Sequence, residues 1–289
     1  KQVFVAGIMQ HIEEAGIHSG DSACSLPPVS IKPFLIEEIK NQTKKLALAL
    51  KVKGFMNVQF AIKKDKIFVI EVNPRASRTV PFVSKSKNLP LAKIASRVMA
   101  GEKLSKFNLK SKTKKMFAVK EAVFPFNKFP NSDLLLGPEM KSTGEVMGFD
   151  KDFGMAFAKS QIAASNSLPV KGTAFISLKN SHKSEGIELA KKLIKLNFKL
   201  CGTRGTAEYF NNNGIKCKKV NKVNQGSPHI VDVLNAKKIA LVINTGGGNS
   251  ENQLSDAVAL RRATLINKVP YCTNMSTAYV CLDGIKSLK

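Results

Sequence analysis

Apolar positions in the first part of the chain follow helical and then extended spacing. The stretch VSIKPFLIEEIKNQTKKLALALK, which begins near Pro27 and Pro28, repeats apolar residues three or four positions apart and predicts an amphipathic helix. Two extended runs follow, GFMNVQFAIKK and KIFVIEVN, and the polar KKDK joins them, so they predict an antiparallel hairpin. The segment LPLAKIASRVMAG predicts a helix that begins after Pro90 and ends at Gly101.

The pattern changes in the second part of the chain. Residues 102–125 are lysine-rich and less regular, and residues 126–170 contain several prolines and glycines before the helical stretch FGMAFAKSQIAAS. NSLPVKG, at 166–172, predicts a linker. Strand-like and helical runs then alternate: GTAFISL, SEGIELAKKLIKL, FKLCG, TAEYFNNNG, IKCKKV, IALVIN and SDAVALRRATLI. This alternation predicts a parallel sheet covered by helices, and a boundary between two domains near residue 166.

Composition narrows the class of protein. The chain has 289 residues and is 43% hydrophobic, enough to bury the core of one large or two ordinary domains. No apolar run approaches the roughly 18–20 residues of a membrane span. The start, KQVFVAGIMQ, lacks the features of a signal peptide and an initiating Met, which suggests that the chain begins within a longer protein. Five scattered cysteines without a C-x-x-C pair predict a reducing cytoplasm rather than a disulfide framework or a zinc site.

The formal net charge of +25 leaves two interpretations open. One is a solvated lysine-rich surface, because the lysines are dispersed at helical spacing opposite apolar residues. The other is electrostatic attraction of anionic small molecules or of a partner. The chain has no arginine-rich run, no interleaved aromatic residues and no Trp. We therefore expect neither nucleic acid nor a membrane as partner.

The stretch VIEVNPRASRT places an acid, an amide and two arginines at the end of an apolar strand. Glu71 and Asn73 are two positions apart and share a face of that strand. Gln59, on the preceding strand, lies opposite Glu71 if the turn has an odd number of residues, and opposite Ile70 if the turn has two.

With the odd turn, three oxygen-bearing side chains converge beside Arg75 and Arg78. Carboxylate and amide oxygens suit Mg²⁺, which keeps its other positions for water and phosphate. Arginines then neutralise a phosphate or a carboxylate with forked hydrogen bonds. The alternative is a surface hairpin with an incidental pair between Glu and Arg.

The string FMNVQFAIKKDKIFVIEVNPRASRTVPFVSK resembles the metal-binding end of an ATP-grasp domain, and more closely the second ATP-grasp half of the carbamoyl phosphate synthetase large chain. EEAGIHSGDSACSLPP, VPFVSKSKNLPLAKIASRVMAG and PFNKFPNSDLLLGPEMKSTGEVMG are similar to the same family. The resemblance covers essentially the whole chain. It implies an α/β fold, in which a partial ATP-grasp domain with an antiparallel sheet and helices precedes a parallel-sheet, Rossmann-like domain that resembles methylglyoxal synthase.

The resemblance implies three segments and a role for each. Residues 1–105 would form the C-terminal lobe of the ATP-grasp domain, residues 106–165 a connecting segment, and residues 166–289 the allosteric domain. The implied ligands of Mg²⁺ or Mn²⁺ are Gln59, Glu71 and Asn73; the implied ATP contacts are Gly16, Ile17, His18, Ser19, Gln59 and Glu71; and Arg75 and Arg78 match catalytic arginines near the phosphates.

In the family, this half phosphorylates carbamate with ATP to give carbamoyl phosphate, for pyrimidine and arginine biosynthesis. That chemistry needs positioning and charge neutralisation more than a protein nucleophile. The resemblance implies a glutaminase small subunit as partner, and ATP and carbamate or bicarbonate as ligands. The upstream ATP-grasp lobe is not in this sequence, so we expect no carbamoyl phosphate synthesis by the 289-residue chain alone.

Two loops at strand ends, Cys201–Phe210 and Ile243–Ser250, combine Gly with Thr or Asn. Such turns expose backbone N–H groups and suit an anion, although glycine for tight packing explains them equally well. The resemblance implies that effectors such as a nucleotide monophosphate bind here. The matching positions are Lys183, Thr203, Thr206, Lys222 and Asn244. Asn249 and Ser250 stand near the places where bacterial relatives commonly carry paired arginines, which leaves the effector's identity open.

Three acids, Glu13, Asp21 and Glu121, match positions that hold the cationic activator ornithine in bacterial relatives. The alternative is that they pair with lysines of this basic chain. Other functions also remain open. One is a different ATP-grasp ligase such as a biotin carboxylase, which the segment after residue 166 argues against. Another is a nucleic-acid-binding protein, and a third is a purely regulatory ligand-binding module.

Overall fold

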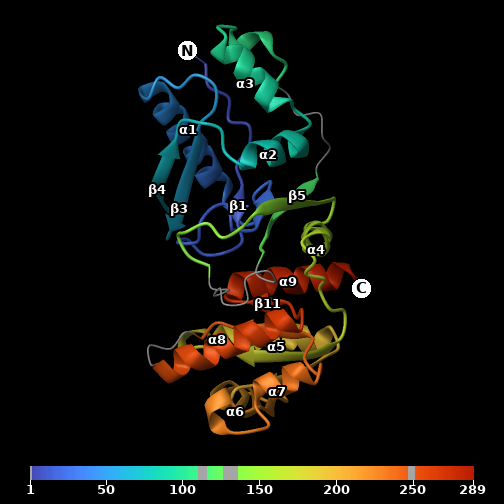
Figure 1. Ribbon diagram of the computed structural model, residues 1–289. Coiled ribbons are helices and arrows are strands. Elements are labelled where there is room, and N and C mark those ends of the chain that lie inside the picture. The colour runs from blue at the N-terminus through green and yellow to red at the C-terminus, as the bar shows by residue number, and fades with distance from the viewer. Residues whose placement is uncertain (1, 110–115, 126–135, 247–250) are drawn as a thin grey trace.

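A computed structural model of the chain describes residues 2–109, 116–125, 136–246 and 251–289. It has an antiparallel sheet with a separate hairpin toward one end and a parallel sheet toward the other (Figure 1). Two helices, α4 (Phe153–Ala163) and α9 (Met275–Ser287), lie against each other between the two sheets. The predicted fold class, an antiparallel lobe followed by a parallel α/β lobe, is confirmed.

The predicted elements of the first lobe are present. Helix α1 (Pro33–Ala49) begins with Pro33 in its first turn, where a missing N–H costs nothing, and buries Leu35 and Ile39. Strands β3 (Asn57–Lys63) and β4 (Lys66–Asn73) form the predicted hairpin. Helix α2 (Thr79–Lys87) follows, and α3 (Leu91–Met99) ends just before Gly101, whose φ of 104° suits glycine.

The antiparallel sheet contains strands that the sequence pattern did not reveal. Its described order is β1 (Gln10–His11), β2 (Cys24–Leu26), β5 (Phe117–Val123) and β6 (Gly144–Asp150). The expectation of a less regular segment over 102–125 is therefore wrong at β5. This strand is buried along most of its length although it contains Lys120 and Glu121, and those two charges hide its apolar pattern.

The second lobe is the predicted parallel sheet. Its described order is β11 (Tyr271–Cys272), β10 (Leu241–Asn244), β7 (Gly172–Ser177), β8 (Phe198–Gly202) and β9 (Lys218–Lys219), and every described pairing is parallel. The remaining elements are η1 (Leu104–Lys106), η3 (Asn180–His182), α5 (Lys183–Lys195), α6 (Arg204–Asn212), η4 (Val223–Gln225), α7 (Ile230–Asn235) and α8 (Glu251–Ile266).

One hydrophobic cluster joins the two lobes. It includes Ile12 and Val119 of the antiparallel lobe, Phe157 of α4, and Ile176 and Ile285 of the parallel lobe. Helices α4 and α9 therefore pack as parts of one core. Among the residues that the structure describes, none of the helices combines the length and apolar character that crossing a membrane would require. The predicted boundary near residue 166 stays a prediction.

Candidate functional site

The β3–β4 hairpin brings the predicted metal-binding residues together by a route that the sequence did not indicate. The turn has only two residues, Lys64 and Asp65, both with positive φ. A regular hairpin with this turn would pair Gln59 with Ile70. Ile70 is instead an extra residue in β4, so Gln59 pairs with Glu71. The expected pairing is present, and the odd-numbered turn that was its premise is wrong.

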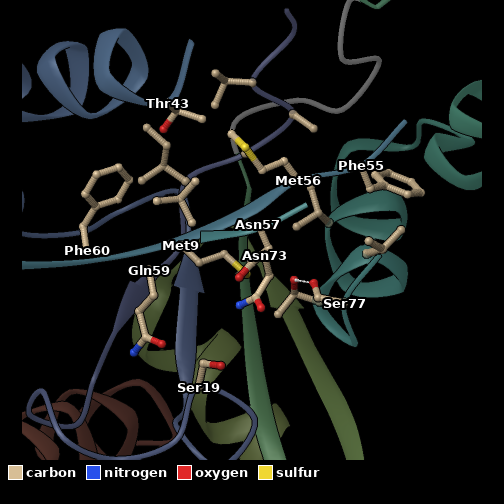
Figure 2. Close-up of a pocket in the computed structure, with 18 of the residues that line it drawn as sticks. Met9, Ser19, Thr43, Phe55, Met56, Asn57, Gln59, Phe60, Asn73 and Ser77 are labelled. Carbon is tan, nitrogen blue, oxygen red and sulfur yellow. Dashed lines mark hydrogen bonds between the residues drawn. The ribbon is translucent and has the colours of Figure 1, made fainter. Parts of the chain in front are cut away.

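The two strands form one wall of a cavity of about 870 Å³. Asn57 pairs with Asn73, next to the pair of Gln59 and Glu71, and all four side chains line the cavity. Figure 2 shows the amides of Gln59 and Asn73 extending into the same part of the cavity, toward Ser19. Asn57 was missed by the sequence analysis, although its position two residues before Gln59 places it on the same strand face.

The oxygen atoms of this wall fit a hard divalent cation that is also bound by an anionic ligand. It offers one carboxylate, Glu71, together with the amides of Gln59 and Asn73. No group of three His, Cys, Asp or Glu side chains within the described ranges could hold a metal. With a single carboxylate, a cation at this wall would need further oxygen ligands such as phosphate, which is how Mg²⁺ is commonly bound with nucleotides.

Arg75 lies beside Asn73 at the hairpin wall, whereas Arg78 contacts Ser142 and Glu145. The guanidinium of Arg75 donates to Asn73 Oδ1 at 3.3 Å and to the carbonyl of Ala76 at 3.0 Å. Arg78 donates to Ser142 Oγ at 3.2 Å, and its Nε lies 3.6 Å from Glu145 Oε1. Both arginines are among the residues that line the cavity.

A buried ion pair that the sequence analysis missed supports Arg78. Lys120, on β5, is fully buried, and its Nζ lies 3.6 Å from the same Glu145 Oε1 that faces Arg78. That oxygen has no hydrogen-bond partner within the described part of the chain. Glu145 is thus shared by two cations. Charged residues inside otherwise apolar strands, KEA in β5 and GEV in β6, were the available signal.

The loop before β2 presents His18 and Ser19 to the cavity. Lys120 Nζ donates to the carbonyls of Ser19 and Gly20, each at 3.2 Å, and so holds the loop in place. His18 Nδ1 accepts from the backbone N–H of Gly20 at 3.0 Å. His18 and Ser19 line the cavity with the hairpin residues. Gly16 and Ile17, the other two predicted nucleotide contacts, precede them but are not among the residues that line it.

Asp21 anchors this loop through backbone contacts. Its carboxylate accepts hydrogen bonds from the backbone N–H groups of Lys141 at 2.7 Å and Ser142 at 2.9 Å. The Asp21 side chain is 1% exposed. Both carboxylate oxygens of Asp21 are thus already bound to protein groups.

Glu13 and Glu121 form a pair of neighbouring carboxyl groups. Glu13 accepts from the backbone N–H of Ala23 at 2.7 Å, and Glu121 accepts from Gln161 Nε2 of α4 at 2.6 Å. Burial raises the pKa of Glu13 to about 7, and burial together with repulsion from Glu13 raises the pKa of Glu121 to about 8. The pair titrates as a unit and holds a proton near neutral pH.

A second candidate site lies at one edge of the parallel sheet. The predicted effector contacts all follow the C-terminal ends of parallel strands: Lys183 after β7, Thr203 and Thr206 after β8, Lys222 after β9, and Asn244 at the end of β10. The strand order reverses between β7 and its neighbour β10, because β8 and β9 follow on one side of β7 whereas β10 and β11 lie on the other side. Ligands of open α/β sheets commonly bind at such a switch point. Asn249 and Ser250 lie outside the described residues.

Hydroxyl groups and a lysine gather at this edge. Thr203, which precedes α6, lies with its Oγ1 3.3 Å from Thr206 Oγ1 and 3.5 Å from Ser177 Oγ. A Cβ atom on Gly205 would lie 3.3 Å from Lys183 Nζ, so this ammonium group is near the N-terminus of α6. A cation beside the positive end of a helix dipole is unfavourable unless an anion joins it. Ser177 was missed by the sequence analysis.

Family models match both lobes. Residues 3–107 match the model described as "Carbamoyl-phosphate synthase L chain, ATP binding domain". Residues 185–273 match the "MGS-like domain". The chain also resembles a crystal structure of methylglyoxal synthase from Elizabethkingia anophelis NUHP1, with 20% identity and a TM-score of 0.33, over 40% of this chain and 79% of that one.

Curated relatives match along the whole chain. A carbamoyl phosphate synthase large chain from Methanosarcina barkeri is 46% identical over 290 residues, which are all of this chain and 72% of that protein. The large chain from Rhizobium meliloti (strain 1021) is 52% identical, and the C-terminal section of the large chain from Aquifex aeolicus (strain VF5) is 48% identical. This chain spans 25% of the Rhizobium protein and 57% of the Aquifex protein.

Proposed function

The chain belongs to the family of carbamoyl phosphate synthase large chains, and we propose that its first lobe supplies the metal-binding wall of a site that phosphorylates carbamate with ATP. The observation that carries the proposal is the pairing of Gln59 with Glu71, next to Asn73, on one wall of the cavity. Gln59, Glu71 and Asn73 would hold Mg²⁺ or Mn²⁺, which neutralises phosphate charge when bound.

The residues around that wall suit phosphoryl transfer. Arg75 lies beside Asn73, Arg78 contacts Ser142, and both line the cavity, so two cations are available to an anionic ligand there. Glu145 and buried Lys120 keep the Arg78 guanidinium in place. Transfer of a phosphoryl group needs positioning and charge neutralisation, which these fixed cations provide. His18 and Ser19, held by Lys120, would contact the nucleotide.

A chimera tests this proposal. This chain would replace the matching quarter of the Rhizobium meliloti large chain, and the purified chimera would be assayed with the glutaminase subunit for carbamoyl phosphate formed from ATP, bicarbonate and glutamine. We expect synthesis by the chimera and a loss of at least 100-fold with Glu71→Gln. Lys63→Ala, an exposed change on the same hairpin, is the control and keeps activity. An active Glu71→Gln chimera would refute the proposed role.

We also propose that the chain acts together with the rest of a large chain and with a glutaminase small subunit in the cytoplasm, for pyrimidine and arginine biosynthesis. The support is the family, because this chain spans a quarter of the Rhizobium meliloti relative. On this proposal the 289-residue chain alone forms no carbamoyl phosphate from ATP and bicarbonate. Detection of that product with the purified chain alone would contradict it.

For the parallel lobe we propose an effector pocket that takes an anionic ligand such as a nucleotide monophosphate. The support is the convergence of Lys183, Thr203, Thr206 and Asn244 at the switch point of the sheet. Lys222 follows β9 at the same sheet edge and would contribute a further charge. The test is binding of uridine 5′-monophosphate by calorimetry. Lys183→Ala should weaken the affinity at least tenfold, because it removes the cation at the start of α6.

We propose that Glu13 and Glu121 bind a cationic effector such as ornithine, with Asp21 holding the loop beside them. Two repelling carboxyl groups in a buried position gain more from a cation than exposed acids would. Ornithine should raise the melting temperature of the chain, and Glu121→Ala should abolish the rise. Glu14→Ala, an exposed neighbour of Glu13, is the matched control and should keep it. A rise that survives in Glu121→Ala would refute this site.

A further inference from the structure

The side-chain amide of Asn244 is fixed in one orientation. The backbone N–H of Gly246 donates to Asn244 Oδ1 at 3.1 Å, and Asn244 Nδ2 donates to Tyr271 Oη at 3.0 Å. A backbone N–H can only donate, so its partner must be the amide oxygen. Asn244 is 6% exposed, and flipping its side-chain amide would place the nitrogen Nδ2 against the Gly246 N–H. Such a contact in a buried place is costly.

A second side chain, that of Arg261, acts on the Tyr271 hydroxyl. Arg261, on α8, is 7% exposed, and its charge and hydrogen bonding lower the pKa of the Tyr271 hydroxyl, against the larger effect of burial, which raises it. Guanidinium groups have donors and no acceptor. The hydroxyl oxygen therefore accepts from Arg261 and from Asn244, which uses both of its lone pairs. The Asn244 amide keeps one N–H in excess of these contacts.

We propose that Tyr271 and Arg261 are positioning residues of the effector pocket, which hold Asn244 as a hydrogen-bond donor toward an acceptor group of the ligand. The inference rests on the proposed effector pocket, of which Asn244 is part. Three consecutive elements of the chain meet here: the end of β10, the helix α8 and the strand β11. A donor at this position favours a ligand that presents phosphate or carbonyl oxygens, and disfavours one that presents only donors.

The test is a double-mutant cycle in the full chain, with uridine 5′-monophosphate as the probe and calorimetry as the readout. Tyr271→Phe keeps the ring and removes the hydroxyl, so we expect an affinity about three- to tenfold weaker, the effect of one neutral hydrogen bond. Asn244→Ala should weaken binding at least as much. Adding Tyr271→Phe to Asn244→Ala should change the affinity no further, because Tyr271 acts through Asn244.

The control removes the hydroxyl of Thr264, a buried residue of α8. Thr264 Oγ1 donates to the carbonyl of Leu260 within α8, and Thr264 is 1% exposed. Thr264→Val should lower thermal stability by an amount similar to Tyr271→Phe and leave the affinity unchanged. This comparison separates positioning of Asn244 from a general loss of packing.

Each outcome gives a decision. An additive loss in the double variant would show that Tyr271 does not act through Asn244, and would overturn the inference. An unchanged affinity in Tyr271→Phe, together with a loss in Lys183→Ala, would overturn the inference while the effector pocket stands. Unchanged affinity in both Lys183→Ala and Tyr271→Phe, or no binding by the unaltered chain, would overturn the proposed pocket and the inference with it.

Discussion

Gln59 faces Glu71 across the β3–β4 hairpin because Ile70 is accommodated as an extra residue in β4. The two-residue turn at Lys64 and Asp65 sets a register that would otherwise leave Gln59 opposite an apolar side chain. A shift of one residue moves every later side chain of a strand to the other face. The bulge therefore determines that the carboxylate of Glu71, rather than the side chain of Ile70, pairs with the amide of Gln59 at the cavity wall.

Glu71→Gln and Asn73→Ala should each weaken the binding of Mn²⁺ together with ATP by about 10- to 100-fold, the usual effect of disturbing a metal site. Glu71→Gln replaces the only carboxylate of this trio by a neutral amide, Asn73→Ala removes an amide oxygen, and both changes leave the hairpin turn intact. The measurement is a titration of Mn²⁺–ATP followed by electron paramagnetic resonance. Lys63→Ala should bind as the unaltered chain does. Equal binding by all of these variants would exclude this wall as the metal site.

Lys120→Met should lower the free energy of unfolding by about 3–5 kcal/mol, the usual cost of breaking a buried ion pair. The change leaves Glu145 and the carbonyls of Ser19 and Gly20 without this fully buried ammonium group. Urea unfolding measures the effect. Lys199→Met, an exposed position on β8, should change stability by about 0.5 kcal/mol or less.

A double variant separates charge from packing. Because Glu145 is the carboxylate nearest to Lys120, adding Glu145→Gln should restore part of the stability lost in Lys120→Met. No restoration would mean that Lys120 stabilises the fold by packing and by its carbonyl contacts alone.

The contribution of Glu13 and Glu121 to the free energy of unfolding should fall as the pH rises from about 4.5 to about 8. Burial raises the pKa of Glu13 to about 7, and burial together with repulsion from Glu13 raises the pKa of Glu121 to about 8, from an ordinary value of 4.5. In this window the folded chain binds more protons than the unfolded chain, so each step up in pH favours unfolding. Thermal melting across this range measures the trend.

Glu121→Gln removes one of the two titrating groups and keeps an acceptor for Gln161. This variant should match the unaltered chain near pH 4.5 and be the more stable of the two near pH 8. Glu14→Gln is the matched control, because Glu14 is exposed beside Glu13, and it should follow the unaltered chain throughout. Parallel pH profiles for the unaltered chain and Glu121→Gln would contradict the raised pKa values.

Gly154→Ala should lower the free energy of unfolding by about 1–3 kcal/mol, the usual cost of overpacking. Gly154 lies in the first turn of α4, where this helix packs against α9. A Cβ atom there would lie 2.5 Å from the carbonyl oxygen of Asp283. The control is Gly137→Ala, because a Cβ at that position meets no atom within 4 Å. Equal stability of the two variants, by urea unfolding, would show that α4 and α9 separate at little cost.

Periodicity predicted much of the molecule because helices and parallel strands repeat apolar residues at fixed intervals. The hairpin, the helix α3 and the alternation of β7, α5, β8, α6, β9, β10 and α8 follow from it, whereas α7, β11 and α9 were not predicted. The edge that gathers Lys183, Thr203 and Asn244 also follows, because loops after parallel strands meet at one side of a sheet.

The remaining features depend on contacts between distant segments. Lys120 reads as a surface lysine in the sequence, and only the pairing of β5 with β2 and β6 shows that it is enclosed. The bulge at Ile70 has no local signal, since the residues around it are ordinary strand formers. The contact between Tyr271 and Asn244 joins residues 27 positions apart. Such relationships arise from tertiary packing, which a one-dimensional pattern does not contain.

The binding of a divalent cation at the hairpin wall is tested most directly by paramagnetic broadening in the isotope-labelled chain. Mn²⁺ with ATP should broaden the side-chain amide signals of Gln59 and Asn73. The signal of Asn213 should stay sharp, because this residue directly follows α6, a helix toward the opposite end of the molecule from the hairpin (Figure 1). Mg²⁺ in excess should reverse the broadening. Unchanged signals for Gln59 and Asn73, or equal broadening of all three amides, would contradict the account.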